Sequence, residues 1–493
     1  MSVLGPMLLA QTVSAFAGTE PPPDASEVAL RPSELQYVEA RWMETVIRGR
    51  PWVPHKRVAT VSKGTRLVVR GEVDSRDDNG CHGKTWYAVW PFGFVCSEQV
   101  RKTEVPPETT KALPVPEGKR LPHAYAMVRT EGAPSYANAE NAELGIPEQA
   151  LTKGMSLVVE RGVDIGEQSF VQTSAGKLVP RQDVGWMGQG SSWSGVLIET
   201  DEPGPLFAWV RNPKTPVLAA PERGAERVRT VELRERVPLL EPDAQLAPLW
   251  WRVGEGEWIE ADSLNEVHVV EPPAGVTSEG RTEATGNDQW LDVDVGEQVL
   301  VAYRGAVPQY ATLISSGRGS PTPLGNYPIW AKVASMDMAN QDYEDKPYMV
   351  QGVPWVLLFQ GHNALHGAYW HDRFGNRKSH GCVNLAPVDA RWAFEWAGPT
   401  LPMGWTGYLP SDLGHSPVVH VRDSSRPPGA TFTQQRPMGP PDPELERAKL
   451  DAAEQRRAAR AEDEGREEIG AGDPLPRRDG PVPRIEPPRP PSG

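Results

Sequence analysis

Short apolar runs separated by glycine and polar turns fill the chain between residues 37 and 272. Arg66-Leu67-Val68-Val69 and Trp86-Tyr87-Ala88-Val89 are two of these runs. Brief runs rich in Val and aromatic side chains, bounded by turn residues, predict β-strands. The same order of runs returns further along, which indicates repeated units. The pattern therefore predicts three small all-β units, over residues 37–106, 120–190 and 205–272, the third being the faintest.

A different pattern occupies residues 286–412, where the apolar runs are longer. Residues 298–303 and 310–314 are two such runs on either side of a turn at Arg304-Gly305. This arrangement predicts a β-hairpin. Residues 355–359 add a buried strand that leads towards His366. We expect a β-rich domain over 286–412, joined to the units before it by a Gly-, Ser- and Thr-rich segment at 274–286.

A single helix is expected in this domain, over residues 387–397. Pro387 suits the first helical turn, and Gly398-Pro399 follows as a stop signal. Val388, Trp392 and Trp396 recur every four residues, which predicts that they form the face packed on the sheet.

The end of the chain, residues 413–493, is rich in Pro, Arg, Glu and Asp and lacks apolar periodicity. Such a composition predicts a disordered tail. Within it, residues 443–468 carry charges at helical spacing but few large apolar side chains, so we expect a solvated and partly helical segment.

Composition and charge narrow the classes of partner. The net charge of −14 is the opposite of what a nucleic-acid binder needs, so no nucleic-acid partner is expected. No run approaches the ~20 apolar residues of a membrane helix. Residues 1–17 combine an apolar stretch with Ala15-Phe16-Ala17, which resembles the cleavage site of a signal peptide, although no Lys or Arg precedes it. We expect export to the cell envelope, with residues 18–36 as a linker.

Three cysteines are present, and two of them, Cys81 and Cys96, lie close together in the first β unit. Two interpretations are open: a disulfide, which an oxidising envelope would permit, or two buried thiols. A zinc site is disfavoured because no fourth ligand stands at the usual spacing. In an exported chain Cys382 would be the unpaired cysteine.

The third cysteine belongs to the run Ser379-His380-Gly381-Cys382-Val383-Asn384, and the pair His366-Gly367 stands sixteen residues before Cys382. A thiol becomes a strong nucleophile as thiolate, and a nearby imidazole can accept its proton. Gly381 would allow consecutive backbone N–H groups to point at one oxyanion. The run therefore predicts nucleophilic catalysis by Cys382 with His366 as the base.

These residues resemble the signature of the L,D-transpeptidase catalytic domain, the YkuD-like family of cell-wall enzymes. The resemblance extends to residues 290–294, 319–325 and 364–371. The first two β units, for example Lys63-Gly64-Thr65-Arg66-Leu67-Val68, resemble bacterial SH3-like modules. The fold class implied is mainly β: tandem small SH3-like β-barrels, then a β-rich L,D-transpeptidase catalytic domain with a few helices, then the disordered tail.

The resemblance implies a thioester acyl-enzyme on Cys382, formed from a peptidoglycan stem tetrapeptide with release of D-Ala. His366 would be the base, and the backbone carbonyl of Gly367 would orient its imidazole. Backbone N–H groups of His380, Gly381 and Cys382 would hold the oxyanion. The acceptor would be the amine of a second stem, giving a 3→3 cross-link, or a protein amine. No metal or cofactor is implied.

Other residues near the motif have two interpretations each. The candidate substrate-binding residues are Ser379, Asn384, Tyr369, Trp370 and His371. The alternative interpretation is that Ser379, His380 and Asn384 only shape the loop that presents Cys382 and that Trp370 is a core residue. Arg373, Arg377 or Lys378 would suit a stem carboxylate, although surface charge is an equally simple explanation. The histidines His362, His366, His371 and His380 also invite a zinc interpretation, which the transpeptidase spacing disfavours.

Two rival functions stay open besides the transpeptidase. The same acyl-enzyme could be hydrolysed by water, giving an L,D-carboxypeptidase, because acceptor choice depends on channel shape and water exclusion. Alternatively, the chain could be a non-catalytic wall-binding protein whose β units hold glycan or a wall protein through exposed aromatic rings. For Trp86, Trp250 and Trp251 the simpler interpretation is burial in the core of their units.

Overall fold

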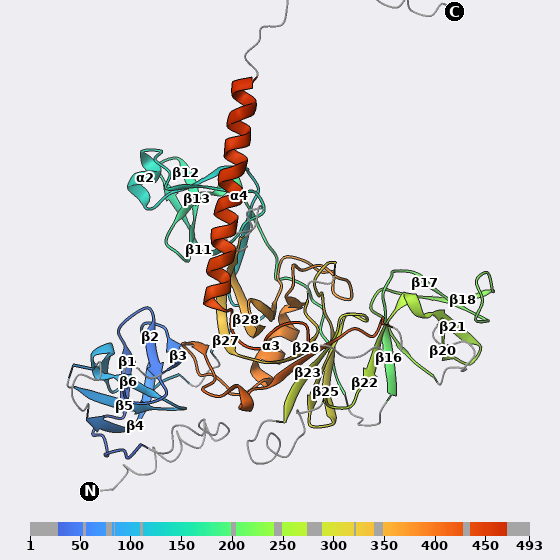
Figure 1. Cartoon of the computed structure of the whole chain (residues 1–493), viewed down its shortest axis with the longest axis horizontal. Helices are drawn as coiled ribbons and strands as arrows, with labels where there is room; N and C mark the ends of the chain where they lie inside the picture. Colours follow the sequence, from blue (N-terminus) through green and yellow to red (C-terminus); the bar gives the residue numbers. More distant parts are fainter. Residues whose placement is uncertain are drawn as a thin grey trace, which may run out of the picture. The chain divides into compact units, whose positions relative to one another are not determined.

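The structure is a computed structural model that describes residues 28–52, 56–74, 81–82, 84–108, 112–198, 204–240, 249–273, 288–319, 322–339, 349–426 and 434–470. The expected export segment at 1–17 and the joint at 274–286 lie outside these residues. Strands predominate and helices are few, which confirms the predicted fold class in its broad form (Figure 1). The chain divides into two compact units, one of residues 1–339 and 347–441 and the other of residues 340–346 and 442–493.

The first β unit, residues 37–103, is antiparallel throughout. Its strands pair in the order β7–β1–β4–β5–β6–β2–β3. The strands are β1 (Tyr37–Ala40), β2 (Thr45–Arg48), β3 (Arg57–Val61), β4 (Arg66–Asp74), β5 (Thr85–Val89), β6 (Phe94–Cys96) and β7 (Val100–Thr103), with the short helix η2 (Ser97–Gln99) before β7. Cys81 and Cys96 form a disulfide. Of the two interpretations of this cysteine pair, the disulfide is the one observed.

The chain is already ordered before the first strand. Arg31 forms a β-bridge with Glu72, and Val28 packs on the cluster that contains the disulfide. The expected linker at 18–36 is therefore wrong in its last nine residues, because this stretch pairs with β4 instead of standing free.

The second β unit, residues 124–186, has the strand order β14–β8–β11–β12–β13 and a separate pair of β9 with β10. Its elements are β8 (Ala124–Val128), β9 (Ala133–Ser135), α2 (Ala139–Glu143), β10 (Gln149–Leu151), β11 (Ser156–Ile165), β12 (Gln168–Thr173), β13 (Leu178–Pro180), η3 (Arg181–Asp183) and β14 (Val184–Trp186). A small apolar core of its own, with Val128, Leu157 and Val171, holds the unit together.

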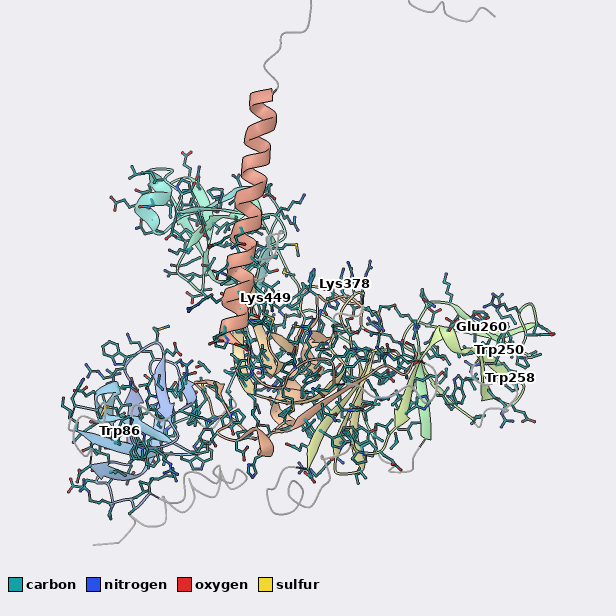
Figure 2. All side chains as sticks on the ribbon, viewed as in Figure 1. Trp86, Trp250, Trp258, Glu260, Lys378 and Lys449 are labelled. Carbon is teal, nitrogen blue, oxygen red and sulfur yellow. A yellow bond between two sulfur atoms is a disulfide. The ribbon has the colours of Figure 1, made fainter. Side chains whose placement is uncertain are left out.

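The third β unit, residues 204–269, consists of a sheet β19–β16–β22 and a sheet β18–β17–β21–β20. Its elements are β16 (Gly204–Val210), β17 (Thr215–Leu218), β18 (Arg227–Val231), β19 (Arg236–Pro238), β20 (Trp250–Gly254), β21 (Glu257–Glu260), η4 (Ala261–Ser263) and β22 (Leu264–Val269). Trp250 and Trp251 are buried here, as Trp86 is in the first unit (Figure 2). Burial removes all three from the candidates for sugar stacking. The assignment of the three units to SH3-like barrels stays a prediction.

Two sheets with a shared apolar core make up the region from residue 288 to 422. One has the order β15–β25–β24–β23–β32–β26, and the other runs β31–β27–β28–β29–β30. The first contains β15 (Val196–Leu197), β23 (Gln289–Asp294), β24 (Val299–Arg304), β25 (Val307–Leu313), β26 (Gly325–Pro328) and β32 (Val418–Arg422). The second contains β27 (Ala331–Ala339), β28 (Met349–Gln360), β29 (Asn363–Gly367), β30 (Val383–Leu385) and β31 (Trp405–Tyr408). The hairpin expected around Arg304-Gly305 is β24–β25.

Residues before the last domain pair with its strands at several points. Strand β3 of the first unit pairs with β31, Ser156 of the second unit forms a bridge to Val350, and β15 adds to the edge of β25. The sequence pattern of each unit is local and carried no sign of these pairings.

The tail boundary expected at residue 412 is wrong. After η5 (Leu413–His415), strand β32 lies between β23 and β26 inside the first sheet. Its Arg422 donates to both oxygens of the buried Asp292 at 3.0 Å and lies 2.7 Å from Asp294. Residues 434–439 then pair with the domain through Gly361 and Leu324. The polar composition of these residues gave no sign that they belong to the domain, because ion pairs and backbone hydrogen bonds hold them there instead of apolar side chains.

The expected helix is present as α3 (Pro387–Trp396) and packs on β28 and β29, but its buried face differs from the prediction. Ala390, Ala393 and Phe394 point inward, whereas Val388 is 37% exposed. Trp392 and Trp396 are partly buried against the same core and stack on each other, and Trp392 also stacks on Tyr310 of β25. The two tryptophans therefore pack as expected, and Val388 is the residue that departs from the prediction.

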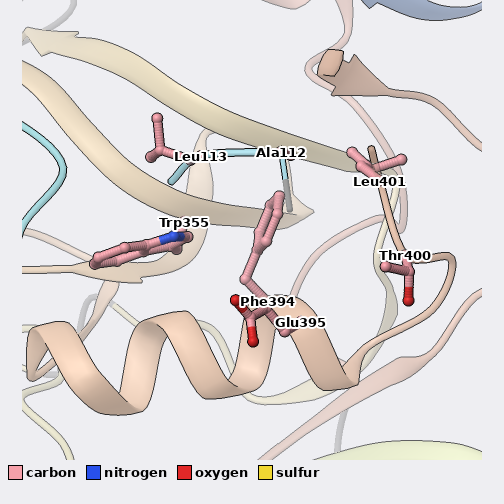
Figure 3. Close-up of a pocket in the computed structure, with 7 residues that line it drawn as sticks. All are labelled: Ala112, Leu113, Trp355, Phe394, Glu395, Thr400 and Leu401. Carbon is pink, nitrogen blue, oxygen red and sulfur yellow. The ribbon is translucent and has the colours of Figure 1, made fainter. Parts of the chain in front are cut away.

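The C-terminal end of α3 is fixed by Lys332, which is buried in β27. Its ammonium donates to the backbone carbonyls of Phe394, Ala397 and Pro399. A cation at a helix C-terminus satisfies carbonyls that lack a partner in the helix and complements its dipole. Phe394 also projects from α3 towards Trp355, beside a hollow of only about 10 Å³ that Ala112 and Leu401 help to line (Figure 3). That volume suits at most one water.

The other compact unit contains α4 (Pro443–Gly470), a long charged helix with a Lys449–Glu446 ion pair. It occupies the stretch for which the sequence predicted a partly helical segment. Among the described residues, no helix is long and apolar enough to cross a membrane.

Candidate active site

Two parallel strands of the second sheet bring the predicted nucleophile and base together. His366 lies in β29, and Cys382 comes directly before β30. The register pairs Leu365 with Val383 and His366 with Asn384. Side chains two residues apart in a strand share a face, and so do direct neighbours on paired strands. Asn384 therefore shares a face of this strand pair with His366, and Cys382 stands directly before the strand that carries Asn384.

The thiol is half-buried, and it contacts the backbone carbonyl of His362 at 3.8 Å. His362 follows the Gln360-Gly361 turn that the segment 434–439 contacts: the N–H of Gly361 donates to the carbonyl of Gly439 at 2.9 Å. The chain after β32 thus supports the backbone on one side of the nucleophile. The sequence contained no sign of this contact.

The loop that presents Cys382 is held on its other side by Ser315, Ser316 and Thr322, which follow β25. Ser315 and Asn384 exchange backbone hydrogen bonds at 2.9 and 3.0 Å, and the N–H of Ser379 donates to the carbonyl of Ser316. The hydroxyl of Thr322 donates to the carbonyl of Gly381 at 2.8 Å. Part of the motif at 319–325 therefore acts by holding the cysteine loop.

Ser379 hydrogen-bonds within this loop. Its hydroxyl donates to the carbonyl of Cys382 at 2.5 Å and accepts from the N–H of Gly381 at 3.2 Å. Gly381 has a φ of +151°, a conformation that residues with a side chain rarely adopt. Since its N–H is engaged by Ser379, this donor is not directed at an oxyanion in the structure. Of the two interpretations of Ser379, the loop-shaping one matches these contacts.

The electrostatics favour an uncharged pair. Burial raises the pKa of the Cys382 thiol, an effect that a hydrogen bond with the backbone of Ala364 opposes. Burial also lowers the pKa of the His366 imidazole to about 4. Removal from water disfavours the charged form of each group. The resting state is therefore a neutral thiol and a neutral imidazole, with the imidazole free to accept a proton at neutral pH.

The orientation of this imidazole is set by the next residue. Nδ1 of His366 lies 3.4 Å from the carbonyl oxygen of Gly367, the contact that the family resemblance implies. A proton on Nδ1 directed at this carbonyl leaves Nε2 as the basic atom.

His371 and Asn384 support each other. The amide of Asn384 lies 2.8 Å from Nε2 of His371, and the N–H of Arg373 donates to Nδ1 at 3.2 Å. Burial and the nearby cations Lys378, Arg234 and Arg373 lower the pKa of His371 to about 4. Asn384 is itself buried, so it fixes the loop and has no surface left for substrate.

Tyr369 and Trp370 occupy different environments in the structure. Tyr369 is 3% exposed, stacks on Tyr125 at 3.7 Å and donates its hydroxyl to the carbonyl of Gln351. The prediction that it walls the substrate channel is wrong, because its ring packs against the second β unit. Trp370 is half-buried, its ring centre lies 5.7 Å from that of His366, and it lines a cavity together with His371.

His380 is exposed, next to the cysteine. Within the described residues, no group of three or more His, Cys, Asp or Glu side chains is arranged to hold a metal ion. The residues that sequence reasoning missed are Thr322, the carbonyl of His362, and three residues of the second β unit that line the cavity, Met127, Gly154 and Ser156. Thr322 lies inside the motif at 319–325, but nothing in the sequence indicated that the others lie near the motif of Cys382.

Solved structures of several L,D-transpeptidases are similar to parts of the chain. The enzyme from Enterococcus faecium is 20% identical and covers 27% of this chain and 49% of its own, with a TM-score of 0.22. The enzyme from Mycobacterium smegmatis is 19% identical over 27% of this chain and 58% of its own, also with a TM-score of 0.22. L,D-transpeptidase 3 from Mycobacterium tuberculosis is 17% identical over 27% of this chain and 60% of its own, also with a TM-score of 0.22.

The chain thus spans about half the length of the first of these enzymes. No curated protein matches the chain. Residues 288–419 match the model of the YkuD family, described as the L,D-transpeptidase catalytic domain, and they contain both strands that carry His366 and Asn384. The match to the L,D-transpeptidase catalytic domain is therefore confined to residues 288–419, about a quarter of the chain.

Proposed function

We propose that this protein is a cysteine-dependent peptidoglycan L,D-transpeptidase of the cell envelope that forms 3→3 cross-links between stem peptides. The observation that carries the proposal is that His366 and the run that contains Cys382 lie on the adjacent parallel strands β29 and β30, inside the segment that matches the family. A thiol and an imidazole on neighbouring strands are the two groups that a cysteine acyltransferase requires.

In the first half-reaction, Nε2 of His366 takes the thiol proton while Sγ of Cys382 attacks the carbonyl carbon of the third stem residue. The oxyanion of the tetrahedral intermediate is held by backbone N–H groups at Cys382 and His380, because that of Gly381 is bonded to Ser379. The intermediate collapses with cleavage of the bond to D-Ala, whose amine takes the proton from His366. A thioester on Cys382 is left.

In the second half-reaction, the side-chain amine of another stem attacks the thioester carbonyl. His366 accepts the proton of this amine and returns it to the sulfur as the C–S bond breaks. The products are a new amide bond and the free Cys382 thiol, so atoms and charges balance without an oxidant or a cofactor.

The decisive experiment incubates the full chain with purified disaccharide-tetrapeptide and analyses the products by mass spectrometry. Dimers lacking one D-Ala are the expected result. Monomeric tripeptides would instead indicate water as the acceptor and an L,D-carboxypeptidase. Unchanged substrate, with binding retained, would indicate the wall-binding alternative, and both of these outcomes contradict the proposal.

A further inference from the structure

A cavity lined by Trp370 and His371 is built by two parts of the chain. It has a volume of about 370 Å³, in the range of sites that hold small molecules and short peptides. Trp370, Arg373 and Lys378 of the catalytic domain line one side, and Met127, Gly154 and Ser156 of the second β unit line the other (Lys378 is labelled in Figure 2). A family domain alone would lack half of this wall.

Two contacts connect the cavity to the reacting groups. Trp370, in its lining, lies beside the His366 ring. His371, also in its lining, is joined to Asn384, two residues beyond Cys382. A ligand in the cavity would therefore lie against the side chains that surround the catalytic pair.

The charge of the lining is positive. The carboxylate of Asp372 is already paired with Arg234 at 2.8 Å and accepts from the hydroxyl of Ser191. Arg373 and Lys378 have no acidic partner among the described residues, and both act electrostatically on His371. Two cations without a counter-charge suit a carboxylate ligand.

The second β unit is held firmly enough to act as a wall. Tyr125 stacks on Tyr369 and donates its hydroxyl to the carbonyl of Gly352 at 2.8 Å. The N–H of Val158 donates to the side chain of Gln351 at 3.1 Å, and Ser156 forms its bridge to Val350. These contacts lie next to the cavity, so its width is set by buried packing.

We propose that this cavity binds the carboxylate-bearing peptide on which Cys382 acts, with Arg373 and Lys378 pairing with its carboxylates and the second β unit forming the opposite wall. The inference rests on the proposed function only in naming the ligand as a peptidoglycan stem peptide. It assigns the second β unit to substrate recognition, a role that spacing along the chain does not require.

Gly154 offers a matched test of that wall. Its φ is +93°, and nothing lies within 4 Å of a Cβ placed there, so a side chain has room. Asn and Asp are the residues best tolerated at positive φ, and they differ in charge but hardly in shape. Gly154→Asp places a carboxylate in the cavity, whereas Gly154→Asn carries the same backbone strain without the charge.

Binding is measured by titration calorimetry with disaccharide-tetrapeptide, in the full chain carrying Cys382→Ala so that no turnover occurs. We expect Gly154→Asp to raise the Kd about tenfold relative to Gly154→Asn, because one lost charge-assisted contact is worth about that factor. Equal affinity of the two variants, or no binding by the Cys382→Ala parent, overturns the inference.

The cationic side is tested with Arg373→Gln and Lys378→Gln in the active enzyme. Each should raise KM about tenfold with a smaller change in kcat, as expected for loss of ground-state binding. Arg161→Gln is the control, since Arg161 lies on the same strand as Ser156 but outside the cavity. Unchanged KM in both variants sinks the inference while leaving the transpeptidase proposal intact. Tight, charge-dependent binding without any turnover would support the cavity inference and contradict the transpeptidase proposal.

Discussion

The two cysteine-bearing regions of this protein show how surroundings decide what a thiol does. Cys81 and Cys96 are 0% and 4% exposed, packed with Trp86 and Phe94, and joined in a disulfide. Cys382 is half-buried at the start of a strand and is the free cysteine. Each of the first two sulfurs is bonded to the other, whereas the third contacts the backbone carbonyl of His362.

The difference lies in the backbone around each site. The disulfide joins residues at the ends of a 15-residue span, so it restrains the unfolded chain. The free thiol is presented by a loop that residues 315–322 and the Ser379 hydroxyl hold in place. One region thus uses cysteine for stability and the other for reactivity, and substitutions should separate these roles cleanly.

The largest effect is expected at the nucleophile. Cys382→Ala should reduce product formation by about 10⁴-fold or more, because the thioester cannot form without the thiol. Thermal unfolding should stay close to that of the parent, since the side chain is small and half-exposed. Mass spectrometry of the stem-peptide products measures the first quantity and circular dichroism the second. Activity retained in this variant would remove Cys382 from the mechanism.

Loss of the base should cost less. His366→Ala should lower kcat/KM by about 10²–10⁴-fold, the usual contribution of a general base. His366→Gln serves as its control, because it keeps polar bulk at this buried position without a titratable nitrogen. Steady-state kinetics on disaccharide-tetrapeptide gives the ratio. A loss in the alanine variant that glutamine largely restores would indicate a packing role instead.

The disulfide should matter for stability and little for chemistry. The double variant Cys81→Ser/Cys96→Ser should lose about 3 kcal/mol of unfolding free energy, the chain-entropy value for a loop of this size. Below its melting temperature the variant should keep near-parental kcat, because the first β unit contributes none of the residues around Cys382. Urea titration and parallel kinetics test the two statements. A large fall in kcat of the folded variant would contradict this separation.

The smallest effect concerns pH. Burial holds the pKa of His366 at about 4, so the base stays unprotonated well below its ordinary pKa of 6.5. Lowering the pH from 7 to 5 should therefore change kcat/KM by less than about twofold, provided that circular dichroism shows the fold intact. An acid limb near 6.5 would mean that the imidazole titrates at its ordinary pKa and that burial does not lower it.

Much of the catalytic domain could be predicted from the sequence, for a specific reason. Cys382, His366 and Gly367 lie within one short stretch whose residue types and spacing could be recognised without any contact between distant segments. The hairpin β24–β25 and the start of α3 at Pro387 were likewise local, because turn residues and a helix-starting proline act over a few positions.

The remaining features depended on contacts between distant segments. The inward face of α3, the place of β32 beside β23, and the packing of Tyr369 on Tyr125 are all set by what lies opposite, often more than a hundred residues away. Apolar periodicity in the sequence indicates that a side chain is buried, but it does not indicate which other side chains it packs against. The sequence by itself determined the mainly β architecture and the motif that contains the nucleophile and base we propose, Cys382 and His366. Only the tertiary structure decided which residues line the cavity near the motif, because residues from four separate segments of the chain converge there.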